Sequence, residues 1–431
     1  MTRDFLRLAV PNILSNVSVP LLSSVDTALM GQLGATHLGA IGLGGMVFNF
    51  LYWNFGFLRM GTTGLTAQAY GARDAQQQAS TLLTAASLAL AIALVLLAAQ
   101  VPLLWLTEAL VPLDVEQTEL VRSYFTIRLW AAPATLLLYV LMGWSFGMQN
   151  AWIPLAITTV ANLVNIVLSY LLVVEYQAGM EGVAWGTVVA QYAAMLFGLV
   201  ALYRRYPQAF ARLRLRWVAE GGRYRKLLRV NADIFVRTLS LSFAFAFFYA
   251  RSAAASGLVL ATTTVLLQFL NWMSYAIDGF AYAAEALVGR FHGARDEASL
   301  RRAIRMSFGW GAALAVLFSV GYAGFGESLI HVFTGDQQVI AASLALMPYV
   351  IALPIIGTAC YIWDGVFVGL TATRAMRDTM LLSLALFLAS YFLLSQSVEA
   401  AVALWLALLV FLGARGVLQS IWYWNRGAAL A

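Results

Sequence analysis

Long apolar runs recur through the whole chain and are separated by short polar breaks. A run of about 20 apolar residues is enough for a helix to cross a bilayer. Only 11% of the 431 residues are charged, against about 25% in soluble domains. The pattern predicts an all-α polytopic membrane protein. We place twelve transmembrane helices at 5–30, 39–66, 79–105, 120–147, 152–174, 182–204, 227–251, 258–288, 302–326, 339–370, 379–395 and 399–423.

Charged residues divide the polar breaks into two sets that alternate along the chain. One set is basic, and its longest member is Arg204–Arg229. The other set is mostly acidic and includes Glu108, Asp114, Glu116, Glu119, Glu175, Glu181, Glu327, Asp336 and Glu399. Because Lys and Arg are retained on the inner side of a membrane, both termini and the basic loop are predicted to be cytoplasmic. The net charge of +6 then reflects topology and contact with lipid headgroups, so we expect no nucleic-acid partner.

The chain also repeats itself at a fixed offset. The sequence GARD at 71–74 recurs at 293–296 (293 − 71 = 222), and the paired glycines of 143–147 recur at 365–369 (365 − 143 = 222). Six helices per repeat keep both halves in the same orientation, with a pseudo-two-fold axis along the membrane normal. The predicted parts are an N-terminal six-helix lobe (1–205), a basic cytoplasmic linker (206–226) and a C-terminal six-helix lobe (227–431).

The first apolar run carries three residues that a simple anchor does not need: Pro11, Pro20 and Asp26. A carboxylate at the centre of a membrane helix costs about 2.5–3.5 kcal/mol on insertion scales. Each proline removes a backbone hydrogen bond, so the helix is able to bend there. A titratable group on a bendable helix predicts a proton- or ion-coupled gate. The alternative is a structural aspartate bonded to a neighbour.

Several motifs in this order resemble the MATE family of multidrug and toxin extrusion transporters, and its DinF branch in particular. They are Val25–Gly31, Arg59–Gln68, Gly71–Asp74, Asn162–Leu168, Asp278–Ala283 and Asp364–Gly369. The resemblance implies twelve helices in two lobes, and export of organic cations or amphipathic drugs against protons or sodium. It also implies that Asp26 is the proton-coupled residue and that Pro11 marks a helix bend.

The chain departs from the family pattern at one position. The branch commonly has an acid four residues after Asn165, where this chain has Ser169. A single carboxylate then remains in the membrane part of the N-terminal lobe. Because hard cations prefer several oxygen ligands, this favours protons over sodium as the driving ion. We expect no cofactor and no bound metal.

Polar residues near Asp26 in the predicted fold are candidates for supporting it. Asn162 and Asn165 are spaced i, i+3 and share one helical face, and Ser169 and Thr187 are weaker candidates. The alternative is ordinary helix–helix hydrogen bonding, which contributes about 0.6 kcal/mol per contact in membranes.

A second polar set lies in the predicted C-terminal lobe. Asp278 and Glu285 are seven residues apart and share a face, and the i, i+4 spacing of Asp233 and Arg237 suits an ion pair. With Asp364 of the tenth helix, they predict a polar network that closes the inner gate. A second cation site is the alternative, because such groups must be paired or face water.

Methionines and aromatic residues crowd the first two predicted helices: Met30, Met46, Phe48, Phe50, Tyr52, Trp53, Phe55 and Met60. Most such residues face lipid or pack together, but some suit a cavity for flat cations.

The sequence therefore predicts a secondary antiporter and not an enzyme, since it has no Ser/His, Cys/His or metal-ligand constellation. We expect a monomer in the bacterial inner membrane, in contact with membrane lipids. The alternatives are sodium-coupled drug export and a flippase for lipids or lipid-linked sugars. A flippase needs buried arginines for a pyrophosphate, and the candidates are Arg59, Arg128, Arg237 and Arg251.

Overall fold

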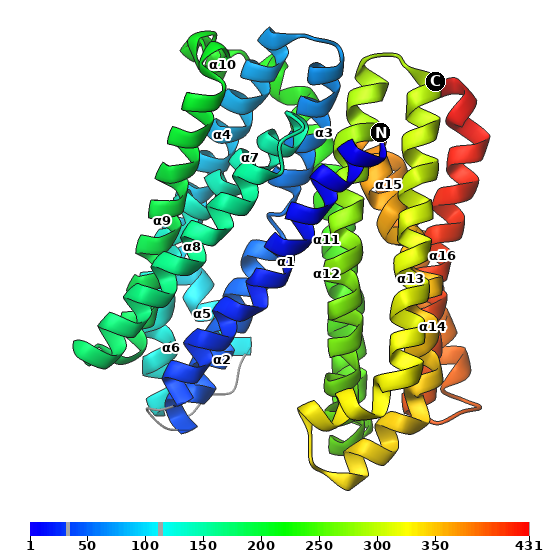
Figure 1. Cartoon of the computed structure of the whole chain (residues 1–431). Coiled ribbons are helices and arrows are strands. Elements are labelled where there is room, and N and C mark those ends of the chain that lie inside the picture. Colours follow the sequence, from blue (N-terminus) through cyan, green and yellow to red (C-terminus); the bar gives the residue numbers. More distant parts are fainter. Residues whose placement is uncertain (32–34, 111–114, 431) are drawn as a thin grey trace. The chain divides into compact units, whose positions relative to one another are not determined.

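The computed structural model describes residues 1–31, 35–110 and 115–430, and all regular structure in these segments is helical (Figure 1). The side chains of residues 17–25, including that of Pro20, lie outside the described set. The first part of the chain forms α1 (Thr2–Gly31), α2 (Ala35–Trp53), α3 (Phe57–Gly71), α4 (Ala75–Ala98), α5 (Gln100–Leu110), α6 (Val115–Arg128), η1 (Leu129–Ala131), α7 (Ala132–Gly147), α8 (Trp152–Tyr170), η2 (Leu171–Glu175), α9 (Gly179–Arg205), α10 (Pro207–Ala211) and η3 (Leu215–Ala219).

The second part forms α11 (Gly221–Ala255), α12 (Gly257–Gly293), α13 (Glu297–Phe333), α14 (Gln337–Gly369), α15 (Thr373–Leu394) and α16 (Ala400–Leu430). Among the described residues, eleven helical segments are long and apolar enough to cross a membrane. The 30-residue helix α1 corresponds to the first predicted helix and completes the set of twelve. The all-α polytopic fold predicted from the apolar runs is confirmed.

Three of the predicted helices are interrupted. The second consists of α2 and α3, and the third of α4 and α5. At the first break, the side-chain Nδ2 of Asn54 donates to the carbonyl of Phe50 at 2.7 Å. The fourth consists of α6 and α7 joined by the short turn η1, with Pro133 at the start of α7. Proline lacks an N–H and suits the first turn of a helix, so its position explains why a new helix begins there.

The chain forms two compact units. Unit one contains Met1–Ile13 and Ala232–Ala431, and unit two contains Leu14–Asn231. In unit one, α12 packs on α14, and α13, α15 and α16 complete the bundle. In unit two, α8 runs beside α9, and α3 packs on α7 and α4. The linker helix α10 lies at one end of unit two, and α2 and α6 begin at the other end (Figure 1).

The 222-residue repeat reappears as a repeated helix contact. A Cβ atom at Gly143 would lie 2.4 Å from the carbonyl oxygen of Arg59, where α7 meets α3. A Cβ atom at Gly365 would lie 2.2 Å from the carbonyl oxygen of Ala281, where α14 meets α12. The contacted residues are 222 positions apart (281 − 59), like the glycines (365 − 143). Small residues allow membrane helices to approach closely, so the equal spacing within this chain reflects the same packing in each unit.

The GARD turns repeat in backbone detail as well. Arg73 and Arg295 have positive φ angles of 56° and 55°, a conformation that is uncommon outside glycine. The following Asp74 caps α4 by accepting the N–H of Gln77 at 2.9 Å. Asp296 caps α13 in the same way, and its bond from the backbone N–H of Ser299 holds the pKa of Asp296 below its usual range. Such N-caps stabilise a helix start.

The contact at Gly365 predicts a sharp effect of one added methyl group. Gly365→Ala should lower the melting temperature of the detergent-purified protein, because overpacking costs about 1–3 kcal/mol. Gly309→Ala on α13 is the matched control, since nothing lies within 4 Å of a Cβ there. The control should raise the melting temperature slightly, by removing backbone freedom from the unfolded chain. Equal melting temperatures for the two variants would contradict the packing described here.

Candidate ion and substrate site

Asp26 lies on the second half of α1, in unit two, and is half-buried. Its carboxylate is beside Ser169 of α8, which is fully buried. Among the described residues, neither Asp26 Oδ1 nor Ser169 Oγ completes a hydrogen bond of ordinary geometry. Nearer the start of the helix, the hydroxyls of Ser15 and Thr158 hydrogen-bond at 2.9 Å and join α1 to α8. A buried carboxylate oxygen without a donor is able to take up a proton or face a cation.

The polar residues of α8 and α9 meet next to this carboxylate. Asn165 Nδ2 donates to Thr187 Oγ1 at 2.9 Å, and Thr187 donates in turn to the carbonyl of Val183. The two helices approach closely at Gly186, where a Cβ atom would lie 2.9 Å from Ser169 Oγ. Asn162, one turn before Asn165, is half-buried. The structure thus hydrogen-bonds Asn165 to Thr187 and places Ser169 beside Asp26, while the functional roles of all four stay predictions.

Arg128, at the end of α6, is a component of this region that the sequence analysis did not place there. Its positive charge interacts with Asp26. Its guanidinium carbon lies 5.4 Å from the ring centre of Phe48 and 5.5 Å from that of Tyr52, within the range of cation–π attraction. Arg128 Nη1 is buried and has no hydrogen-bond partner in the described part of the chain. An arginine inside a predicted span was the available signal, but sequence cannot reveal its neighbours.

In unit one, Asp364 of α14 is the centre of a buried ionic cluster. Arg415 Nη2 donates to Asp364 Oδ2 at 2.7 Å, and Arg237 Nη2 binds the same oxygen. Gln419 Nε2 donates to Asp364 Oδ1 at 2.8 Å. Asp364, Arg415 and Gln419 are all buried. Two guanidinium groups and an amide therefore occupy the carboxylate, which leaves it little capacity for another cation.

The predicted ion pair between Asp233 and Arg237 is wrong. Arg237 binds Asp364, whereas Asp233 accepts from Arg377 Nη1 at 2.6 Å and from Thr373 Oγ1 at 3.1 Å. Both partners come from neighbouring helices, which outweigh the weak preference for i, i+4 pairing on one helix.

The other two acids of the predicted network lie on α12. Glu285 is 1% exposed and Asp278 is half-buried. Arg415 and Gln419, near the end of the last helix, were missed by the sequence analysis although an arginine in an apolar run is a warning of a buried partner.

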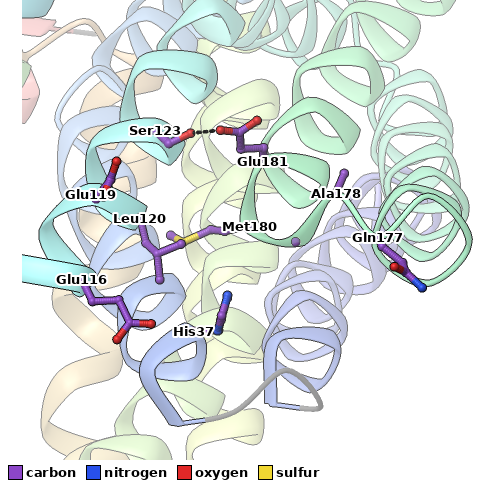
Figure 2. Close-up of a pocket in the computed structure, with 10 residues that line it drawn as sticks. His37, Glu116, Glu119, Leu120, Ser123, Gln177, Ala178, Met180 and Glu181 are labelled. Atoms are coloured by element: carbon purple, nitrogen blue, oxygen red, sulfur yellow. Dashed lines mark hydrogen bonds between the residues drawn. The ribbon is translucent and has the colours of Figure 1, made fainter.

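An acidic hollow of about 350 Å³ opens at the end of unit two where α2 and α6 begin (Figure 2). Glu116, Glu119 and Glu181 line it, together with His37. Ser123 Oγ donates to Glu181 Oε1 at 2.6 Å. The three glutamates come from two different acidic breaks of the sequence, and α10 of the basic linker lies at the opposite end of the unit (Figure 1). The predicted division of charge between two sides therefore holds within unit two.

The cluster around Asp364 predicts unequal effects of removing its members. Asp364→Asn should destabilise the protein by about 3–5 kcal/mol, because it leaves two buried guanidinium groups without a counter-ion. Arg415→Gln should cost less, since Arg237 still binds the carboxylate. Melting temperatures of the purified variants measure both effects. A larger loss in Arg415→Gln than in Asp364→Asn would contradict the shared-carboxylate geometry.

Comparison with known proteins agrees with this architecture. The sequence model of the MatE family matches residues 11–171 and 234–393, which begin 223 (234 − 11) and end 222 (393 − 171) positions apart. DNA damage-inducible protein F from Escherichia coli (strain K12) is 37% identical over 428 residues, covering 98% of this chain and 93% of the relative. A probable multidrug resistance protein NorM from Bradyrhizobium diazoefficiens is 28% identical over 389 residues, covering 87% and 81%.

Solved structures share the fold at low sequence identity. A MATE protein in a straight conformation matches with a TM-score of 0.89 at 18% identity, covering 99% of this chain and 96% of the other. The bent conformation matches with a TM-score of 0.88, also at 18% identity, covering 100% and 96%. The twelve-helix, two-lobe fold and the resemblance seen in the sequence are thereby confirmed. The chain belongs to the MatE family, on the branch of DNA damage-inducible protein F, and is a multi-pass membrane efflux transporter and not an enzyme.

Proposed function

We propose that this protein exports organic cations in exchange for protons, and that Asp26 carries the proton. The observation that supports this most strongly is the half-buried Asp26 carboxylate, whose Oδ1 has no hydrogen-bond donor among the described residues. A carboxylate that lies inside a membrane and is not neutralised by an ion pair is, by default, a candidate functional site.

The surroundings of Asp26 favour a proton over a sodium ion. Sodium prefers several oxygen ligands of a hard type, whereas this site offers one carboxylate and the neutral groups of Ser169, Asn165 and Thr187. The amide nitrogen of Asn165 donates to Thr187, and Asn165 Oδ1, which has no partner among the described residues, would add one neutral oxygen to the single carboxylate. The positive charge of Arg128 acts on Asp26 as well, and it opposes a second small cation. A proton needs only one free oxygen.

Organic cations suit the aromatic side of the same region. The faces of Phe48 and Tyr52 already attract one delocalised cation, the guanidinium of Arg128. A flat drug cation has the same preference for ring faces, and it would compete with the proton for the negative charge of Asp26. Mutual exclusion of proton and drug at one carboxylate gives antiport when the transporter changes its facing state only with one of the two ligands bound.

Helix α1 is suited to transmit this exchange. Its first turns pack on α12 in unit one, where a Cβ atom at Gly279 would lie 2.3 Å from Ile13 Cγ1. Pro11 is buried close to this contact. A bend at Pro11 would let the segment with Asp26 move while the first turns stay packed. The straight and bent conformations known for a MATE protein, which this chain matches about equally, support such a change.

The proposed orientation follows from charge. The basic breaks favour a cytoplasmic position for both termini and for the linker, in a bacterial inner membrane. The acidic hollow of Glu116, Glu119 and Glu181 then opens to the outside. A cleft lined by one sign of charge raises the local concentration of the opposite charge, here protons and departing cations.

The contacts of the candidate arginines disfavour the flippase alternative, which needs arginines that can bind a pyrophosphate. Arg237 and its neighbour Arg415 bind Asp364, and Arg251 donates to the hydroxyl of Tyr391 at 2.8 Å. A pyrophosphate would have to displace these partners. Arg128, whose Nη1 has no partner among the described residues, acts on the nearby Asp26 carboxylate, which would repel a pyrophosphate.

The carboxylate predicts the outcome of a single substitution. Asp26→Asn should abolish uptake of a fluorescent organic cation into inverted membrane vesicles driven by an imposed pH gradient in sodium-free buffer. Asparagine keeps the shape of the side chain and removes its titratable proton, so folding should be unaffected. Asp4→Asn is the matched control, because Asp4 is on the same helix but its side chain is 60% exposed. Wild-type uptake by Asp26→Asn, or an absolute need for sodium, would refute the proposal.

A further inference from the structure

A small polar hollow lies at the basic end of unit two, between α4 and the start of α11. Its volume is about 50 Å³, and its polar lining consists of Gln77, Ser80, Thr81, Thr84, Arg223 and Lys226. No carboxylate lines it. Drug-sized ligands occupy pockets of about 300–1,000 Å³, so the hollow suits a single small group. Two cations and a row of hydroxyl and amide groups are the chemistry of an oxyanion site.

Arg223 is held in a fixed position at this hollow. It forms an ion pair with Glu220 through Nε and donates from Nη1 to Ser80 Oγ at 3.1 Å. Its guanidinium carbon lies 4.8 Å from the ring centre of Trp217, which is buried. These contacts leave Arg223 Nη2 without a partner among the described residues. A guanidinium that is already oriented loses less entropy when it binds an anion.

Lys226 adds a positive charge to the hollow that no carboxylate in the described part of the chain neutralises. Glu220 compensates Arg223, whereas Lys226 is exposed and forms no ion pair within the part of the chain that the structure describes. It follows Arg223 by three positions, so both side chains lie on one face of α11. The next turn of α4 is tied to α11 by the hydrogen bond between Ser87 Oγ and Tyr224 Oη at 2.7 Å. The hollow is therefore a positive site with rigid walls.

Exposed apolar side chains near these cations in the sequence point to the source of the anion. Leu215 of η3 is 82% exposed and Leu228 of α11 is 48% exposed, and both are close in sequence to several arginines. Exposed leucines among basic residues are typical of a segment that lies in the membrane interface. We propose that Gln77, Ser80, Arg223 and Lys226 bind the phosphate of an anionic phospholipid and thereby fix the linker to α4 at the membrane surface.

A specific phosphate site differs from diffuse attraction of a basic surface to anionic lipid. Diffuse attraction depends on charge alone and treats neighbouring cations alike. A site also depends on its neutral donors. The discriminating variants are therefore Lys226→Gln and the charge-neutral Gln77→Ala, with Arg225→Gln as the matched control. Arg225 is exposed on the same helix and does not line the hollow.

The test is a titration of the full-length protein in neutral detergent with phosphatidylglycerol, followed by native mass spectrometry. Wild type should bind one phosphatidylglycerol more tightly than phosphatidylcholine. Lys226→Gln should weaken that binding about fivefold, which corresponds to about 1 kcal/mol. Gln77→Ala should weaken it by a smaller factor, and Arg225→Gln should bind as wild type does.

Three outcomes would overturn the proposal. Equal binding of the two lipids would exclude an anion site. Equal losses in Lys226→Gln and Arg225→Gln, with none in Gln77→Ala, would indicate diffuse attraction. Inorganic phosphate is the remaining arm of the titration. If it stabilises wild type against heat as strongly as phosphatidylglycerol does at equal concentration, and Lys226→Gln removes that effect, the site binds free phosphate instead of lipid.

Discussion

The cost of placing a charge inside a membrane distinguishes the acids of this protein from one another. Asp364 meets that cost with two guanidinium groups and the amide of Gln419. Asp26 has a serine beside it, an arginine charge nearby and an oxygen without a donor. A buried carboxylate that is fully paired is stable in its charged form, whereas one that is only partly satisfied can exchange ligands. This contrast supports the proposal that Asp26, and not Asp364, takes part in coupling.

The two units use one packing scheme for these different purposes. Paired glycines bring α7 onto α3 and α14 onto α12 at equivalent positions, 222 residues apart. The position equivalent to Thr63 is Glu285 (285 − 63 = 222), and both residues are buried. A repeated backbone therefore carries different polar side chains in its two copies, which is how one fold holds a partly satisfied carboxylate in unit two and a fully paired carboxylate in unit one.

The sequence predicted the helices and the repeat because each depends on local pattern or spacing, and Asp26 is a candidate site for the same reason. Apolar length marks a span, and a carboxylate in a span is conspicuous. Pairings across helices were predicted less well. The i, i+4 spacing suggested Asp233 with Arg237, but Arg377 and Asp364 are their partners, from helices more than 100 residues away in the chain. Arg415 and Arg128 were missed as neighbours of Asp364 and Asp26 for the same reason, since tertiary packing alone brings them there.

Proton release on drug binding tests whether Asp26 carries the proton. An organic cation added to the purified protein in weakly buffered detergent should release about one proton per bound cation, measured with a pH indicator. Wild type should release this proton and Asp26→Asn should release none, with cation binding followed in parallel by fluorescence. Undiminished proton release from Asp26→Asn would contradict this role of Asp26, because another group would then carry the proton.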